Sequence, residues 1–294
     1  MVTPNQRENQ MSNISRINYA LQSFKVGGSL IGGVQSVGAS STTNIETFSA
    51  FGSTAAVPIV QDIDLEITVE AAMGGWASPA IIWDSPVDVE IIYSLSTGGF
   101  SVIKLNAVAS SYSLQMGVDG PATESVTFQN TGTSVFGAGS ASALHAGANC
   151  SVITRPDFTS FSATNTGDCE GTGAAGAISY GNVLSVGMSW DAGVEKVSIL
   201  GQSLPAGKFA TFPVEVTTEV ETHAAGAPGL PNSQVITNNK AAGYLYDLAI
   251  GLGSKSRGTT GAVMASSSIQ GGDVGGGNVS TSTSWTSYSS FSYS

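Results

Sequence analysis

The nine-residue segment 62–70, in which apolar and polar residues alternate strictly, constrains this chain most. Its odd positions are the apolar residues Ile63, Leu65, Ile67 and Val69. Its even positions are the acidic or hydroxyl residues Asp62, Asp64, Glu66, Thr68 and Glu70. Successive side chains of a β-strand point to opposite faces, so the segment predicts a strand with one apolar and one acidic face. Closely spaced carboxylates without a cation repel one another, which indicates that the acidic face serves a purpose.

The same pattern returns in segment 214–221. Ile63 corresponds to Val214 and Glu70 to Glu221, each at an offset of 151 residues. The acidic side of this second segment carries Glu215, Glu219 and Glu221, and its apolar side carries Val214, Val216 and Val220. The sequence therefore predicts two strands of one design, each with its aliphatic side chains in the protein core.

Composition limits the classes of function. Of the 294 residues only 11% are charged, ten are Lys or Arg, and the net charge is −11. Nucleic-acid binding through phosphates needs clustered Lys and Arg, so the acidic balance argues against it. Segment 1–10 is polar, and no run approaches the roughly 20 apolar residues of a membrane helix, so we expect neither a signal peptide nor a membrane span. Cys150 and Cys169 are typical of free thiols, although their pairing stays open.

Short alternating segments separated by glycine-rich turns predict an all-β protein with one or two short helices, one of them at 44–52. We divide the chain into a flexible N-terminal arm (1–13), a first β module (14–129), a Gly/Ser/Ala-rich connector or arm (130–177), a second β module (178–270) and a C-terminal tail (271–294). The tail is rich in Gly, Ser, Thr and Tyr, which is typical of a mobile end, but its aromatic residues could dock on a neighbour.

Three sequence matches predict an internal duplication. Segment 33–38 resembles 196–201, the two acidic segments resemble each other, and 111–118 resembles 245–252. The matches keep their order along the chain. Chance is the alternative explanation, because alternating Val/Glu strands resemble one another easily.

No catalytic, cofactor or metal site is expected. His145 and His223 are expected to be surface histidines in Gly/Ala-rich loops. Segment 187–191 only half resembles a nucleophile elbow, since the final Gly is missing. Alternate carboxylates of one strand lie about 7 Å apart, which is too far for one calcium ion without loop oxygens. The chain is therefore not expected to be an enzyme.

Segment 108–127, VASSYSLQMGVDGPATESVT, resembles a hairpin of the tail tube proteins of long-tailed bacteriophages. Segment 33–37, followed by the expected short helix and by 63–70, is similar to an earlier part of such proteins. The resemblance implies tandem β-sandwich or barrel modules whose strands join neighbouring subunits into a continuous inner barrel. It also implies stacked rings in the virion tail, assembled in the host cytoplasm, through which DNA passes.

A tube of this kind predicts a role for the acidic strands. We expect a channel lining formed by Asp62, Asp64, Glu66, Glu70, Glu215, Glu219 and Glu221. Carboxylates there would repel the DNA backbone, so DNA would pass without specific binding. The expected partners are other copies, in rings of three chains that imitate a sixfold ring or otherwise in rings of six, and other tail proteins. The alternatives are a decoration or head protein, a bacterial surface filament subunit and a calcium-stabilised adhesin.

Overall fold

The computed structural model describes residues 23–49, 51–52, 54–73, 85–94, 100–139, 152–167, 178–200, 206–223, 245–271 and 279–293. At 60–63, 94, 133–139, 167, 178–179 and 293 it describes the backbone alone. About three quarters of these residues lie in strands, which pair antiparallel, and this confirms the all-β class. Within the described residues the one helical element is the single 3₁₀ turn η2 (Arg155–Asp157).

The strands of the first half of the chain are β1 (Ser23–Val26), β2 (Ser29–Leu30), β3 (Val34–Phe48), β4 (Val57–Ala72), β5 (Val87–Ser94), β6 (Phe100–Gly117) and β7 (Thr123–Gly139). Those of the second half are β8 (Phe158–Gly167), β9 (Ile178–Tyr180), β10 (Val183–Asp191), β11 (Val194–Val197), β12 (Gly207–Ala210), β13 (Glu215–His223), β14 (Leu245–Leu252), β15 (Lys255–Gln270), β16 (Ser280–Ser287) and β17 (Ser290–Tyr293).

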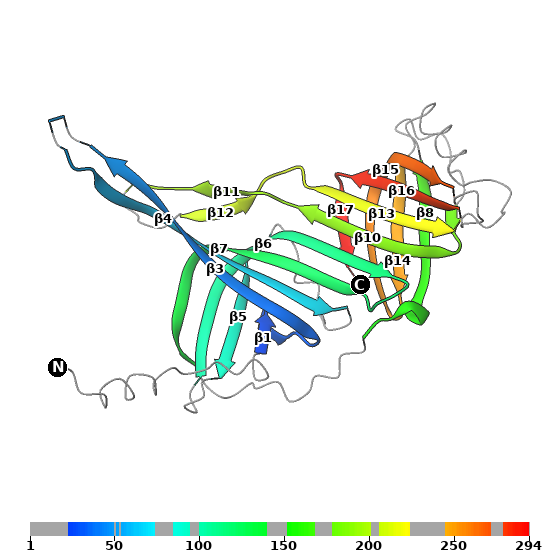
Figure 1. Cartoon of the computed structure of the whole chain (residues 1–294), viewed down its shortest axis with the longest axis horizontal. Helices are drawn as coiled ribbons and strands as arrows, with labels where there is room; N and C mark the ends of the chain where they lie inside the picture. Colours follow the sequence, from blue (N-terminus) through cyan, green and yellow to red (C-terminus); the bar gives the residue numbers. More distant parts are fainter. Residues whose placement is uncertain are drawn as a thin grey trace, which may run out of the picture.

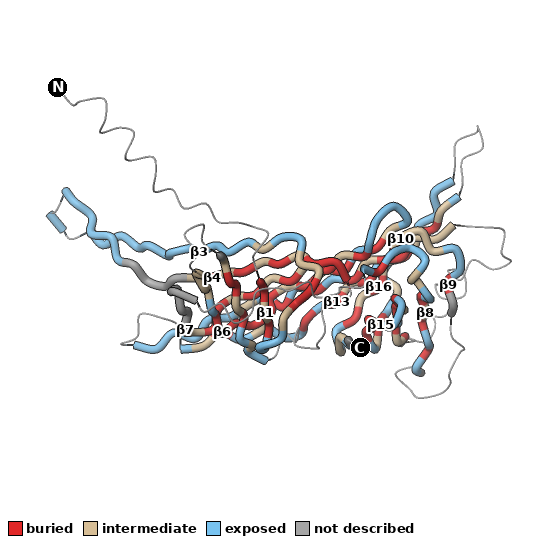
Figure 2. Tube along the Cα trace, turned by 90° about the horizontal axis from the view of Figure 1, so that it is seen from below, coloured by how far each residue is buried: buried red, intermediate tan, exposed pale blue. Residues whose placement is uncertain are grey.

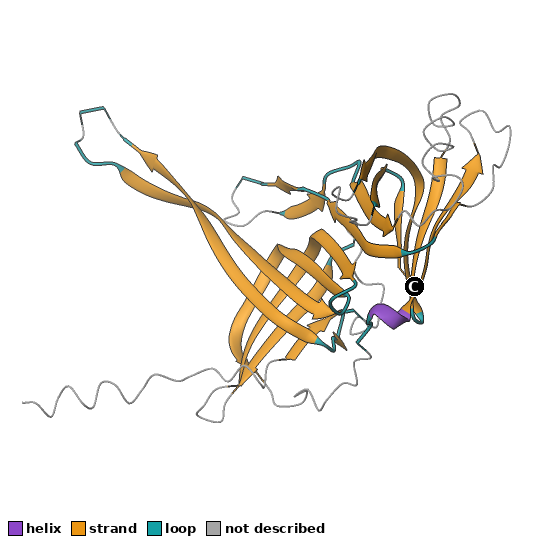
Figure 3. Cartoon of the chain, turned by 45° about the vertical axis from the view of Figure 1, so that its right-hand side comes forward, coloured by secondary structure: helices purple, strands orange, loops and turns teal. Residues whose placement is uncertain are grey.

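One continuous antiparallel sheet joins the two halves, with strands in the order β3-β4-β7-β6-β10-β13-β16-β15 (Figure 1). The long strand β6 makes the junction. One of its edges pairs with β7, and the other pairs first with β5 and then, over 111–117, with β10. Each half also curls into its own lobe (Figure 3).

The two halves share one strand order. Followed from each strand to its paired neighbour, the first half runs β2-β1-β5-β6-β7-β4-β3, and the second half runs β9-β8-β14-β15-β16-β13-β10. Corresponding strands follow each other in the same sequence order. The second half adds the separate β11–β12 hairpin between β10 and β13, at the place where the first half has the tip of the β3–β4 hairpin.

Two irregularities of the ladders also correspond between the halves. The β3–β4 ladder shifts register between Val34 and Ser36, and the β10–β13 ladder shifts between Val183 and Ser185. The β6–β7 ladder shifts between Ala109 and Ser111, and the β15–β16 ladder shifts between Met264 and Ser266. Bulges place an extra residue at one defined point of a strand, so these shifts align β3 with β10 and β6 with β15 residue by residue.

The core lies on the apolar face of this sheet. Leu65, Ile67 and Val69 are buried, as are Val214, Val216 and Val220, which confirms the predicted alternation of both acidic strands. The outer strands fold over this face: Phe24 of β1 lies 6.3 Å from Phe128 of β7, and Tyr246 of β14 lies 5.2 Å from Trp285 of β16, measured between ring centroids. Figure 2 shows this buried layer along the middle of the molecule.

The helix predicted at 44–52 is wrong. Strand β3 continues to Phe48, and its pairing with β4 extends to the Phe48–Val57 pair. Thr42, Thr43 and Ile45 are β-branched, and cross-strand pairing decides their conformation over the local cap signal. The result is a long hairpin whose exposed tip projects from the body (Figures 1 and 2).

The predicted tail is also corrected. Strand β16 lies between β13 and β15, and its Trp285 is completely buried. The serines and threonines around Trp285 are typical in composition of a mobile segment, but in strand β16 their side chains alternate between the core and the surface. Part of the predicted connector is strand as well, since β7 reaches Gly139 and β8 pairs with β14. The predicted arm 1–13 lies outside the described residues.

Of the three sequence matches, only the acidic pair joins strands with the same place in the sheet, β4 and β13. Segment 33–38 enters β3, which corresponds in place to β10 and not to 196–201. Segment 111–118 falls at the end of β6, which corresponds to β15, whereas 245–252 forms β14. Alternating strands resemble one another too closely for short matches to identify the right partner.

Candidate functional site

The acidic side chains of β4 and β13 lie on the same face of the sheet. Residues directly opposite each other in an antiparallel ladder point to the same side. One unbroken row of such neighbours crosses β4, β7, β6, β10, β13 and β16: Glu70, Ser125, Ser113, Ser189, Thr217 and Thr286. The polar side of β4 is therefore continuous with the polar side of β13, although more than 140 residues separate them.

We call this surface the acidic face. Its carboxylates are Asp64, Glu66, Glu70, Asp191, Glu215, Glu219 and Glu221. All of them are exposed or half-buried. Most other positions on the face are Ser or Thr, for example Ser113, Thr127 and Ser284. The side chain of Asp62 lies outside the described residues.

Asp191 belongs to the acidic face and was missed by sequence reasoning. Its position opposite Glu215 in the β10–β13 ladder places the two carboxylates side by side. The sequence signal existed, because Val186, Met188 and Trp190 alternate toward the core and so put residue 191 on the opposite side. The sequence Asp191-Ala192-Gly193 is typical of a turn, and this concealed the place of Asp191 at the end of a strand.

Hydroxyl groups contact several of these carboxylates. Ser36 Oγ lies 3.4 Å from Glu70 Oε2 and donates to it, and Ser185 Oγ donates to Glu221 Oε2 over the same distance. These two contacts occupy corresponding places in the two halves. Tyr288 Oη donates to Glu215 at 3.2 Å, and this hydrogen bond together with the Glu215 charge raises the pKa of Tyr288. Neutral donors of this kind leave the negative charge of the face in place.

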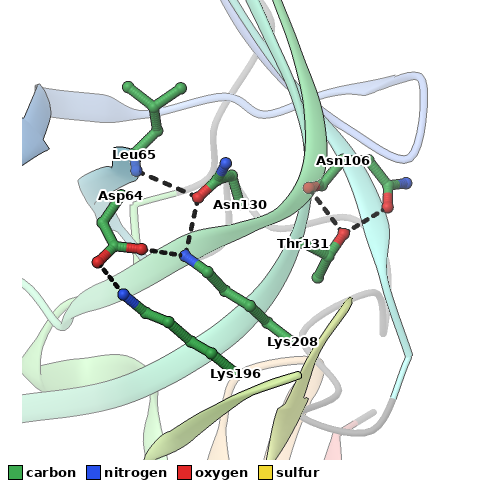
Figure 4. A network of polar contacts seen from close by, with 7 residues as sticks. All are labelled: Asp64, Leu65, Asn106, Asn130, Thr131, Lys196 and Lys208. Carbon is green, nitrogen blue, oxygen red and sulfur yellow. Dashed lines mark hydrogen bonds and ion pairs between the residues drawn. The ribbon is translucent and has the colours of Figure 1, made fainter. Parts of the chain in front are cut away.

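Asp64 is different, because two lysines meet it (Figure 4). Lys208 Nζ donates to Asp64 Oδ1 at 2.6 Å and to Asn130 Oδ1 at 2.9 Å, and Lys196 binds the other Asp64 oxygen. Asn130 Oδ1 also accepts from the Leu65 amide at 3.1 Å. Segment 62–70 contains no cation of its own, but the fold brings two lysines to Asp64. The lysines arrive from the β11–β12 hairpin, which no local pattern connects with β4.

This network fastens the hairpin to the first half of the sheet. Lys208 is almost fully buried, with 1% of its side chain exposed, and a buried charge of this kind needs a paired partner. Burial raises the pKa of Asp64, but hydrogen bonds and charges from Lys196 and Lys208 outweigh burial and hold the pKa below its ordinary value. Asp64 is thus ionised at neutral pH and locked to the hairpin.

Two open depressions, of about 510 and 520 Å³, mark the acidic face. The first is lined by four serines, Thr217, Asp191 and Glu215, together with Tyr112 and Trp190. The second lies beside Glu219 and Glu221 and is lined by Gln115, Thr123 and Ser185 among others. Both linings carry carboxylates and no Lys or Arg among the described residues, and both also include apolar side chains such as Trp190 and Val220. Such a surface suits water and repels anions.

The described residues contain no cluster of three or more His, Cys, Asp or Glu side chains able to hold a metal ion. His223 Nδ1 lies 3.5 Å from the carbonyl oxygen of Val279. His145, Cys150 and Cys169 lie outside the described residues. Among the helices that the structure describes, none is long and apolar enough to cross a membrane.

No family model matches this chain, and no curated protein matches its sequence. The function must therefore be inferred from the acidic face and from the edges of the sheet that carries it.

Proposed function

We propose that this chain is a structural subunit of a hollow tube, the tail tube of a long-tailed bacteriophage, whose acidic face lines the channel for DNA. One observation carries the proposal: both acidic strands, far apart in sequence, lie on one face of one continuous sheet. Apart from Asp64, which binds Lys196 and Lys208, the described carboxylates of this face have no Lys or Arg beside them, and a solvated outer surface would not need that arrangement.

The edges of the sheet support assembly. Strand β3 pairs with β4 alone among the described strands, and beyond the end of β14 residues 263–270 of β15 pair only with β16. Long unpaired edges invite further strands, and closure of a ring of subunits removes them. Copies joined from edge to edge would form a ring with the acidic face inside and the outer strands of each lobe outside.

The charge of the face supports transport of DNA. Carboxylates on a channel wall raise a negative potential that opposes contact with phosphates, so DNA would slide past without specific binding. The partners under this proposal are other copies of the chain, further tail proteins and passing DNA, and the chain acts in the virion tail without catalysis. A decoration protein or surface filament could use the same edges, but neither needs an acidic inner face.

We also propose that the halves are duplicated tube modules, so that three chains complete a ring with pseudo-sixfold symmetry. The shared strand order and the aligned bulges support this duplication more strongly than the sequence matches do.

Electron microscopy of the concentrated purified protein tests the proposal. The expected result is rings or tubes with a central channel, and a map in which Glu66 and Glu219 face the lumen. A protein that stays monomeric at every salt and protein concentration would refute the tube function, as would a map with these side chains facing outward.

A further inference from the structure

We propose that the junction between the two halves of one chain is the template for the junction between neighbouring copies. In this arrangement the free edge of β15 pairs with β3 of the next copy as β6 pairs with β10 within the chain. The inference rests on the proposed assembly into rings, and it specifies the surface, the register and the partner, which is a second copy of this chain.

The bulges give the correspondence from which the register follows. Ala109 and Ser111 match Met264 and Ser266 at an offset of 155 residues. The bulge of β3 at Val34–Ser36 matches that of β10 at Val183–Ser185 at an offset of 149. Position 113 of β6 thus corresponds to 268 of β15, and position 189 of β10 corresponds to 40 of β3.

The register of the β6–β10 ladder gives the register expected between β15 of one copy and β3 of the next. Ser113 lies opposite Ser189 between β6 and β10, and this pair becomes Ser268 opposite Ser40 of the next copy. By the same transfer, Ser266 would face Thr42 and Gln270 would face Gly38. All of these residues belong to the acidic face, so the polar surface would continue from one copy into the next.

Exposed apolar side chains mark the surfaces that such a partner would cover. Ile269 is 54% exposed, whereas its counterpart Leu114 in β6 is 1% exposed. Val263 is 42% exposed, whereas its counterpart Val108 is 2% exposed. Leu114 lies within the β6–β10 ladder, whereas Val108 lies just before it and pairs with Gln129 of β7. Ile269 and Val263 lie on the free edge of β15. The absence of a neighbouring copy in the single chain accounts for the difference.

The same correspondence between the halves predicts where the projecting tip of the β3–β4 hairpin binds. Its counterpart, the β11–β12 hairpin, packs beside β6 and β7 and reaches Asp64 on β4. The tip would therefore lie on β15 and β16 of the adjacent copy, near Glu215, which corresponds to Asp64. The tip carries no lysine, so its contact would be made by exposed apolar side chains: Ile45, Phe48, Phe51, Val57 and Ile59.

Disulfide trapping tests the register. In a background with Cys150→Ser and Cys169→Ser, the chain carries Ser40→Cys together with Ser268→Cys. Residues directly opposite in antiparallel strands have Cα atoms about 4.5–5.5 Å apart, within the range that a disulfide spans. Oxidation should yield intermolecular cross-links that a reductant reverses. The cross-linked products should increase in size by one chain at a time, up to the number of chains in the closed ring.

The matched control replaces Ser40→Cys by Ser41→Cys, because Ser41 lies opposite Leu65 and points to the other face. A shift of one residue along a strand moves the side chain to the opposite face of the sheet, so the cysteine introduced at position 41 would point away from the one at position 268. The yield of cross-linked product should therefore be at least about tenfold lower for the control than for the matched pair. Phe48→Ser with Phe51→Ser should lower the yield of the matched pair several-fold by weakening the hairpin contact.

The outcomes separate the inference from the proposed function. Rings in micrographs without cross-links from the matched pair, or with stronger cross-links from the control, would overturn the interface and leave the tube function standing. If neither rings nor cross-links form from well-folded protein, both proposals fail. Specific cross-linking of the matched pair in the assembled protein supports the template.

Discussion

Arg257 and Glu124 form an ion pair in which both side chains are completely buried, although they lie 133 residues apart in the chain. Arg257 Nε donates to Glu124 Oε1 at 2.9 Å, and Tyr112 Oη donates to the same oxygen at 2.6 Å. Arg257 stands on β15 and Glu124 on β7, so the pair connects the two halves through the core. A buried ion pair at this position holds the two halves in contact inside the core.

Breaking this pair from one side should be costly. Arg257→Met leaves the Glu124 carboxylate buried without its cation, and we expect a loss of about 3–5 kcal/mol in the free energy of unfolding. Replacing both residues, Arg257→Met with Glu124→Leu, should recover most of that loss. Urea denaturation measures both values. The exposed pair Lys104–Asp88 is the control, and Lys104→Ala should cost no more than about 1 kcal/mol. Equal effects at the two pairs would contradict the structural role.

The hairpin contact at Asp64 should respond to acid. The folded pKa of Asp64 lies below its ordinary value of 3.8, so its stabilising contribution is present above that value and is lost as pH falls through the lowered pKa. Hydrogen exchange of residues 206–210, corrected for intrinsic rates, should stay slow at pH 5 and accelerate only below about pH 4. Asp64→Asn should accelerate exchange at neutral pH and flatten the dependence. A transition near pH 6 would point to another group.

Two aromatic residues test the corrected C-terminus. Trp285→Ala removes a fully buried side chain from β16, and we expect a loss of about 3–5 kcal/mol in thermal or urea unfolding. Tyr288→Ala, only three residues later, removes a side chain that is 58% exposed and should cost far less. Similar small effects at both positions would mean that the segment behaves as the tail that its composition suggests.

Charge reversal tests the acidic face. Glu66→Lys with Glu219→Lys places cations on the proposed channel wall at positions with exposed or half-buried side chains. Tube assembly should persist, while DNA release from particles should slow, because phosphates would be attracted to the wall. Added salt should relieve the defect by screening. Asp119→Lys, in the exposed β6–β7 turn, is the matched control and should release DNA at the normal rate.

The mass of an isolated ring tests the duplication. Two modules per chain predict three chains per ring, which native mass spectrometry would detect directly. Six chains would refute the pseudo-sixfold arrangement while leaving the tube function intact. A continuous range of masses would instead indicate that edge-to-edge contacts form open helical filaments.

The sequence by itself determined the properties that follow from the two-residue alternation of apolar and polar side chains. The alternation in 62–70 and 214–221 identified strands, the faces of Leu65 and Val216, and the acidic character of the opposite side. These properties are local, because neighbouring side chains of a strand must point in opposite directions and buried unpaired carboxylates are too costly to permit the reverse.

The tertiary structure alone decided which strands meet. It brought both acidic strands to one face, placed β16 in the middle of the sheet, and carried Lys208 to Asp64 across 144 residues. Cross-strand partners and registers are set by long-range packing and ladder hydrogen bonds, and strands of similar pattern are interchangeable in any short window of sequence. For the same reason two of the three short sequence matches join strands with different places in the sheet, and only the tertiary structure gives the strand order that the two halves share.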